Sequence, residues 1–116
     1  MHEVGLCQAV LDAVERRAAG RTVQRVRIRS GVLNRVDEPS MQQAFALVSE
    51  GSVAEGATVD LEVVPVVVEC DACGSESISD DVMVTCPQCG RTGVRLRGGD
   101  ELTLVSIDVS PAQVPT

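Results

Sequence analysis

The segment that decides the fold carries two matched cysteine pairs, Cys70-Asp71-Ala72-Cys73-Gly74 and Cys86-Pro87-Gln88-Cys89-Gly90. Two residues separate the cysteines of each pair, a spacing that lets both sulfurs face one point. Together the pairs supply four thiolates, the ligand set of tetrahedral zinc with bonds of about 2.3 Å. The glycine after each second cysteine accepts a left-handed backbone, so the turn can aim N–H groups at the sulfurs. This spacing predicts a four-thiolate zinc site.

Two other uses of the same cysteines remain open at this point. A rubredoxin-like iron centre takes the same four thiolates, and two redox-active dithiols would use each pair separately. The sole histidine, His2, lies far away in the sequence and is not expected to complete the site.

Composition limits the classes of partner. The 116 residues include one phenylalanine, no tyrosine and no tryptophan, so the core must be built from Val, Leu, Ile and Ala. The net charge is −7, and all ten basic residues are arginine. Nucleic-acid binding normally needs a basic surface and aromatic side chains that stack on bases. We therefore expect no nucleic-acid partner.

The sequence also predicts where the protein works. No apolar run approaches the ~18 residues of a membrane-spanning helix, and the N-terminus lacks the basic region and apolar stretch of a secretory signal. We expect a cytoplasmic protein without membrane insertion. In that compartment, paired cysteines are more typical of metal ligands than of disulfides.

Hydrophobic periodicity predicts an α+β fold with a small sheet of about three main strands and two helices. Asp37 or Glu38 is expected to cap the second helix, which ends before Gly51, with Pro39 in its first turn. The other expected elements are a helix over 4–19 and strands over 22–30, 58–64 and 101–109.

Pro65 interrupts this pattern and marks a domain boundary. We expect one α/β domain formed by residues 1–65 and 98–116, with residues 66–97 inserted as a four-cysteine, zinc-ribbon-like module. Oligomeric state is left open between a monomer, a homodimer and strand exchange through the Pro65 hinge.

Charges are distributed unevenly along the chain. Arg25, Arg27 and Arg29 share one face of the first strand, and Asp60 and Glu62 share one face of the second. If the strands are neighbours, cross-strand ion pairs follow; otherwise both faces are simply solvated. Residues 36–90 contain eleven carboxylates and no basic residue, which is typical of a solvated acidic face or of a docking surface for a basic partner.

The chain starts Met1-His2-Glu3, and a bulky second residue usually prevents removal of the methionine. The α-amine of Met1, the deprotonated amide of His2 and a ring nitrogen of His2 can chelate one ion, a near-planar arrangement that favours Ni(II) or Cu(II). Glu3 would add its backbone nitrogen or its carboxylate as a ligand, or would orient the imidazole without binding the ion itself. The alternative is a solvated terminal histidine.

The chain resembles the HypA/HybF family of hydrogenase nickel-incorporation proteins. The resemblance covers nearly the whole chain, in order. It is carried by Met1-His2-Glu3, by Val26-Arg27-Ile28-Arg29-Ser30-Gly31-Val32-Leu33, by Phe45-Ala46-Leu47-Val48, by Ala54-Glu55-Gly56-Ala57 and by the two cysteine pairs.

This resemblance implies a nickel metallochaperone rather than an enzyme, and makes residues 1–65 and 98–116 the nickel-binding domain. Ni(II) would bind His2, the amine of Met1 and Glu3. Zn(II) would bind Cys70, Cys73, Cys86 and Cys89. The implied partners are a HypB-type GTPase and the large subunit of [NiFe]-hydrogenase, and in some bacteria the urease accessory proteins.

One stretch departs from the family pattern, and two other functions compete with this one. Many relatives continue after Glu3 with Leu-Ser or Met-Ser, whereas this chain has Val4-Gly5-Leu6-Cys7. Gly5 weakens the first helical turn, and Cys7 is either a buried structural thiol or an auxiliary nickel ligand. The competing functions are a zinc-ribbon module that binds nucleic acid or protein, and a CxxC thiol redox sensor.

Overall fold

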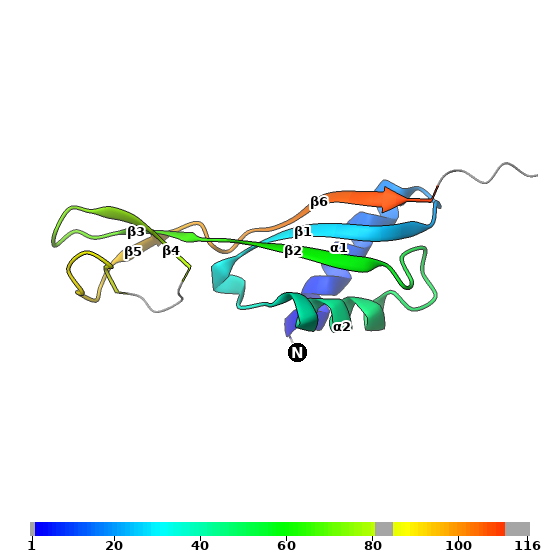
Figure 1. Ribbon diagram of the computed structural model, residues 1–116, viewed down its shortest axis with the longest axis horizontal. Coiled ribbons are helices and arrows are strands. Elements are labelled where there is room, and N and C mark those ends of the chain that lie inside the picture. Colours follow the sequence, from blue (N-terminus) through cyan, green and yellow to red (C-terminus); the bar gives the residue numbers. More distant parts are fainter. Residues whose placement is uncertain (1, 81–84, 111–116) are drawn as a thin grey trace, which may run out of the picture. The chain divides into compact units, whose positions relative to one another are not determined.

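A computed structural model describes residues 2–80 and 85–110 (Figure 1). It confirms the α+β class. The elements, in chain order, are α1 (His2–Ala18), β1 (Val23–Gly31), a 3-10 turn η1 (Val32–Asn34), α2 (Glu38–Val48), β2 (Thr58–Val64), β3 (Val66–Glu69), β4 (Glu76–Ser79), β5 (Arg95–Arg97) and β6 (Leu102–Val109). Within these ranges, no helix is long and apolar enough to cross a membrane.

The chain divides into two compact units. The first comprises residues 1–28, 36–62 and 103–116, and the second comprises residues 29–35 and 63–102. The domain limits expected from the sequence, 66 and 97, stay a prediction. The expected return of the last strand to the sheet is confirmed, because β6 pairs beside β1 in the order β2-β1-β6.

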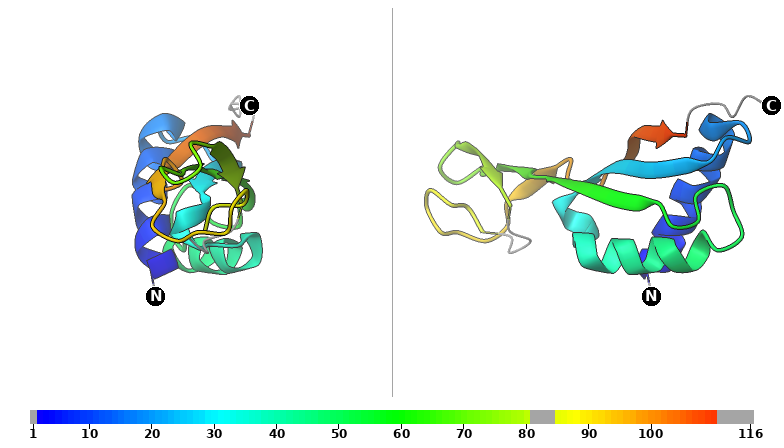
Figure 2. Two further views of the ribbon diagram at one scale, coloured as in Figure 1. Left: turned by 90° about the vertical axis from the view of Figure 1, so that its left-hand side faces the viewer. Right: turned by 45° about the vertical axis from the view of Figure 1, so that its right-hand side comes forward.

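The first unit is built on this sheet and on the two helices, which pack against each other (Figures 1 and 2). Each helix buries one stripe. The buried core side chains are Cys7, Val10, Val14 and Ala18 from α1, Met41, Ala44 and Phe45 from α2, and Val23, Val26, Ile28 and Val59 from the sheet. Val63, expected on the same face as Val59, is 43% exposed.

Local sequence signals set the limits of α2. Asp37 is its N-cap, and the carboxylate accepts a hydrogen bond from the backbone N–H of Ser40 at 2.8 Å, with Pro39 in the first turn as expected. Gly51 follows the helix with φ 77°, a conformation that glycine adopts without steric cost. The chain can therefore reverse and enter β2.

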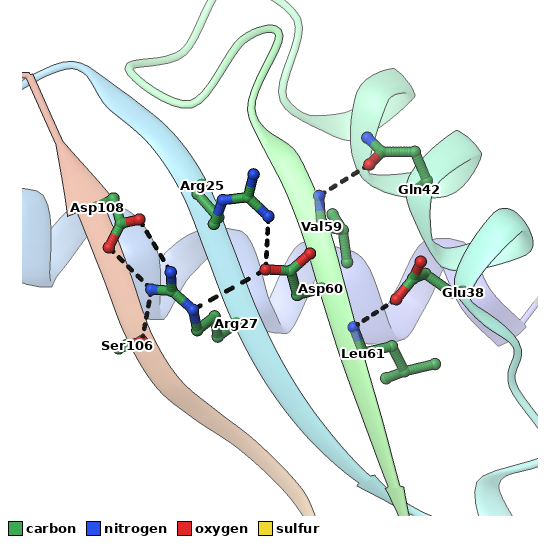
Figure 3. A network of polar contacts seen from close by, with 9 residues as sticks. All are labelled: Arg25, Arg27, Glu38, Gln42, Val59, Asp60, Leu61, Ser106 and Asp108. Atoms are coloured by element: carbon green, nitrogen blue, oxygen red, sulfur yellow. Dashed lines mark hydrogen bonds and ion pairs between the residues drawn. The ribbon is translucent and has the colours of Figure 1, made fainter.

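Side chains of α2 cover the outer edge of β2 (Figure 3). The Gln42 side-chain oxygen accepts from the N–H of Val59 at 2.8 Å, and its amide donates to the carbonyl of Ala57 at 3.2 Å. The Glu38 carboxylate accepts from the N–H of Leu61 at 3.0 Å. An edge strand with unpaired N–H groups invites pairing with another chain, so these contacts close the edge.

The cross-strand ion pairs expected from the sequence are present (Figure 3). Arg25 contacts Asp60 at 2.7 Å, and Arg27 lies 3.9 Å from the same carboxylate. Arg27 also donates two hydrogen bonds to Asp108 on β6, at 2.8 and 3.1 Å. These bonds lower the pKa of Asp108 and raise that of Arg27. The groups are solvent-exposed, so each pair adds little stability.

The second unit contains a smaller sheet of order β4-β3-β5, antiparallel throughout. Val66 and Val68 of the central strand are buried. On the opposite face, Glu69 pairs with Arg97, and Arg97 also contacts Glu76 at 3.2 Å. Few apolar side chains are therefore buried in this sheet, and the loops that it carries need another source of stability.

We predict that Gln42→Ala destabilises the protein by about 1–3 kcal/mol, because it removes two hydrogen bonds and leaves the N–H of Val59 without its acceptor. Gln43→Ala, one residue further along the same helix and exposed, is the matched control and should stay within about 0.5 kcal/mol of wild type. Urea unfolding followed by circular dichroism measures both. Equal midpoints for the two variants would contradict this role of Gln42.

Candidate metal centre

The four paired cysteines converge on one point in the second unit. The sulfurs of Cys70, Cys73, Cys86 and Cys89 all lie within 4.8 Å of one another. The Cys70 and Cys89 sulfurs lie 3.7 Å apart, and the Cys73 and Cys86 sulfurs lie 3.6 Å apart. A tetrahedral ion with 2.3 Å bonds needs sulfurs about 3.8 Å apart. The cluster therefore fits a four-thiolate metal ion, and none of the cysteines forms a disulfide.

Two loops with matched backbone hydrogen bonds present these sulfurs. Gly74 N–H donates to the carbonyl of Cys70 at 2.9 Å, and Gly90 N–H donates to that of Cys86 at 2.8 Å. Both glycines have positive φ, 73° and 76°, as expected from the sequence. In the second loop the N–H of Gln88 points to Cys86 Sγ at 3.4 Å, which is the kind of backbone donor that holds a metal ligand in place.

A second matched bond closes each loop, but the residues that provide it differ. Cys70 N–H donates to the carbonyl of Ser75 at 3.0 Å, and Cys86 N–H donates to the carbonyl of Arg91 at 2.9 Å. Ser75 and Arg91 thus occupy equivalent positions. The hydroxyl of Ser75 also lies 3.0 Å from Cys73 Sγ and 3.4 Å from Cys86 Sγ. No sequence pattern singled out Ser75, although a serine two residues after a ligand pair is a signal that could have suggested this contact.

The thiols of Cys73, Cys86 and Cys89 differ in acidity. The Ser75 hydroxyl, followed by the backbone N–H of Cys89, lowers the pKa of Cys86 to about 6, and Ser75 also lowers the pKa of Cys73. The backbone N–H of Arg91 acts to lower the pKa of Cys89, but desolvation and the neighbouring thiols outweigh it and raise that pKa to about 11. Metal binding must therefore displace a proton from Cys89, which makes affinity depend on pH.

An ion pair ties the first cysteine loop to the small sheet. Arg95 of β5 contacts Asp71, which stands between Cys70 and Cys73, at 2.9 Å, and it lies 3.6 Å from Glu69 of β3. Arg95 and Asp71 are largely exposed, so their ion pair orients the loop more than it stabilises the fold.

The other candidate residues lie at the start of α1. The helix begins at His2, two residues earlier than expected, and so includes both His2 and Glu3. His2 Nδ1 lies 2.6 Å from a Glu3 carboxylate oxygen, and the imidazole is 54% exposed. Met1 lies outside the described residues. Within residues 2–80 and 85–110, the four cysteines form the one group of three or more His, Cys, Asp or Glu side chains placed to hold a metal.

Cys7 is fully buried on the inner side of α1. Its sulfur lies 3.6 Å from the carbonyl oxygen of Met41 and 3.9 Å from the Met41 sulfur. Burial, followed by the charge of Glu3, raises the pKa of Cys7 to about 11. A protonated thiol packed against α2 is the environment of a structural cysteine and a poor one for a metal ligand.

These features define a class: a small α+β protein with an inserted four-thiolate metal module and an exposed histidine at the start of its first helix. The family model described as "Hydrogenase/urease nickel incorporation, metallochaperone, hypA" matches residues 1–109. The chain belongs to this HypA family, a family of nickel-incorporating metallochaperones in hydrogenase maturation.

Individual relatives agree with this assignment. The hydrogenase maturation factor HypA of Nitrosospira multiformis is 38% identical over 112 residues, which cover 94% of this chain and 97% of that protein. The same factor of Syntrophus aciditrophicus is 37% identical and covers 94% and 99%. The solution structure of the Ni metallochaperone HypA from Helicobacter pylori shares the fold, with a TM-score of 0.61, 21% identity and coverage of 92% and 96%.

We predict that Cys7 does not react in the folded protein. At pH 8, iodoacetamide should leave Cys7 unmodified over a period in which a control unfolded in urea is fully alkylated, because the thiol is both buried and protonated. Peptide mass spectrometry reads the modification residue by residue. Rapid native alkylation of Cys7 would show that α1 opens readily or that its thiol is accessible.

Proposed function

We propose that this protein binds Ni(II) at its N-terminus and delivers it during maturation of [NiFe]-hydrogenase, while zinc in the four-cysteine site has a structural role. One observation carries the nickel proposal. The sole histidine is exposed in the first turn of α1, with the Glu3 carboxylate against its Nδ1, in a chain whose family incorporates nickel.

The first turn of a helix suits the proposed ligands. The amide nitrogens at the N-terminus of a helix precede its first internal hydrogen bond, so coordination by the His2 amide breaks no bond of the helical ladder. A six-membered chelate ring between this amide and the imidazole closes through Nδ1. Glu3 holds that same nitrogen. Nickel binding by this route therefore requires Nδ1 to leave Glu3, after which the carboxylate is available to the ion.

An exposed site with few ligands also suits a protein that must release its cargo. The proposed set is the Met1 amine, the His2 amide, the His2 imidazole and Glu3. Near-planar nitrogen donation favours Ni(II) and leaves positions at which an acceptor protein can attack the ion. Transfer then proceeds by ligand exchange, without complete dissociation of nickel into water.

The four-cysteine site suits permanent retention of an ion rather than its release. Cys70, Cys73, Cys86 and Cys89 would saturate the coordination of zinc and cross-link two loops separated by twelve residues. Structural zinc supplies about 10–16 kcal/mol of apparent binding free energy in small modules. That free energy would compensate for the small apolar core of this sheet.

We propose a HypB-type GTPase and the hydrogenase large subunit as protein partners, and urease maturation as a second destination, all in the cytoplasm. The chain itself would bind and transfer metal without catalysing a reaction. The carboxylates between residues 36 and 90 favour a basic docking surface on a partner. A homodimer remains a prediction.

We predict that His2→Ala abolishes stoichiometric nickel binding and leaves the fold intact, because it removes a chelating nitrogen from an exposed position. Gln8→Ala, at an exposed position of the same helix, is the control and should bind like wild type. Calorimetric titration of untagged protein with Ni(II) gives the affinity, and an N-terminal extension that blocks the amine should weaken it. Tight binding by His2→Ala would refute the assignment.

We predict that the protein retains one zinc per chain under a reducing thiol, and that Cys73→Ala loses it and disorders residues 66–97. Cys7→Ala is the matched control and should keep its zinc, since Cys7 lies outside the cluster. Elemental analysis and nuclear magnetic resonance spectra measure the two effects. Zinc-free protein that cycles between dithiol and disulfide would instead support the redox alternative.

A further inference from the structure

Ser75 distinguishes the two otherwise matched cysteine loops. Its hydroxyl oxygen lies 3.0 Å from Cys73 Sγ in its own loop and 3.4 Å from Cys86 Sγ in the other. We propose that Ser75 is a positioning residue of the metal site, whose O–H donates to Cys73 and stabilises that sulfur on the metal, so that Cys89 is the most labile ligand. This inference rests on the proposed four-thiolate zinc site.

Comparison of the two loops distinguishes the contribution of the Ser75 side chain from that of its backbone. The carbonyls of Ser75 and Arg91 accept equivalent bonds from Cys70 and Cys86. These carbonyl contacts are therefore shared by both loops, whereas the side-chain hydroxyl beside the second cysteine of a pair is present in the first loop alone.

The four cysteines also differ in solvent exposure, which determines the sulfurs at which the Ser75 hydroxyl matters most. Cys70 and Cys86 are 6% and 2% exposed, whereas Cys73 and Cys89 are exposed. Water, chelators and electrophiles therefore reach Cys73 and Cys89 first. Of these two, Cys73 has the hydroxyl of Ser75 beside it. A hydrogen bond to a thiolate withdraws charge from the sulfur, which lowers its nucleophilicity and its tendency to take up a proton.

A hydroxyl donor also holds the geometry of the cluster. Ser75 lies within reach of one sulfur from each cysteine pair, so removal of its hydroxyl loosens the contact between the two loops. It also removes the donor that offsets the negative charge on Cys73. Loss of a group that supports a metal ligand typically costs 10–100-fold in metal affinity.

The test compares the zinc-loaded full chain with Ser75→Ala and with Ser75→Thr, which retains a hydroxyl. Ser77→Ala, two residues further along in β4, is the matched control. Limited alkylation with iodoacetamide, followed by peptide mass spectrometry, ranks the cysteines. In wild type, Ser75→Thr and Ser77→Ala, Cys89 should react before Cys73. In Ser75→Ala, Cys73 should react about tenfold faster than in wild type and draw level with Cys89.

A spectroscopic measurement separates an effect on the sulfur from a general loosening of the fold. With Co(II) in place of zinc, Ser75→Ala should shift the sulfur-to-cobalt charge-transfer band to lower energy, because a thiolate without its O–H donor gives up an electron more easily. Ser75→Thr should restore the wild-type band. Zinc transfer to a chromophoric chelator should show an affinity loss of about tenfold or more for Ser75→Ala alone.

Several results would overturn the inference. They are equal alkylation of Cys73 and Cys89 in wild type, an unchanged order and band in Ser75→Ala, and a failure of Ser75→Thr to restore them. The zinc content of wild type distinguishes these failures from failure of the site itself. One zinc per chain with no effect of Ser75 rejects the role of Ser75 alone, whereas wild type without zinc rejects the four-thiolate site and this inference with it.

Discussion

The second unit depends on the convergence of four thiols within 4.8 Å of one another. As thiolates at this spacing they would repel one another, and the proposed zinc ion would turn that repulsion into a cross-link between two loops. The unit needs such a link because its small sheet buries few side chains, chiefly Val66 and Val68. A unit of fewer than about 70 residues often relies on a bound metal for stability, because its apolar core is too small.

The first unit is stabilised in a different way. Phe45, the sole aromatic residue, is fully buried, and Met41, Val14, Val26 and Ile28 pack in the same core. The outer edge of β2 is closed by side chains of α2, and Asp60 and Asp108 balance the arginines of β1. Because the apolar core provides the stability, the N-terminal turn of α1 need not be buried, and His2 and Glu3 remain accessible there.

Much of this was accessible from the sequence because the signals are local. The cysteine spacing and the glycine after each pair predicted two loops that share one metal, and Asp37 followed by Pro39 predicted the start of α2. Alternation along residues 22–30 and 58–64 predicted an arginine face and a carboxylate face but left open whether they meet; in the structure Arg25 and Asp60 do. Each of these patterns is visible within one or two short stretches of the chain.

The sequence by itself thus determined the α+β class, the four sulfurs and the family resemblance, since spacing along a chain limits what its neighbouring residues can reach. Only the tertiary structure decided that Gln42 closes the edge of β2, that Asp108 is the second partner of Arg27 and that Ser75 reaches a sulfur of each loop. Gln42 and Val59 are 17 residues apart, and Arg27 and Asp108 are 81 apart. Contacts at such separations depend on how the strands and helices pack, and no local pattern of residues encodes that.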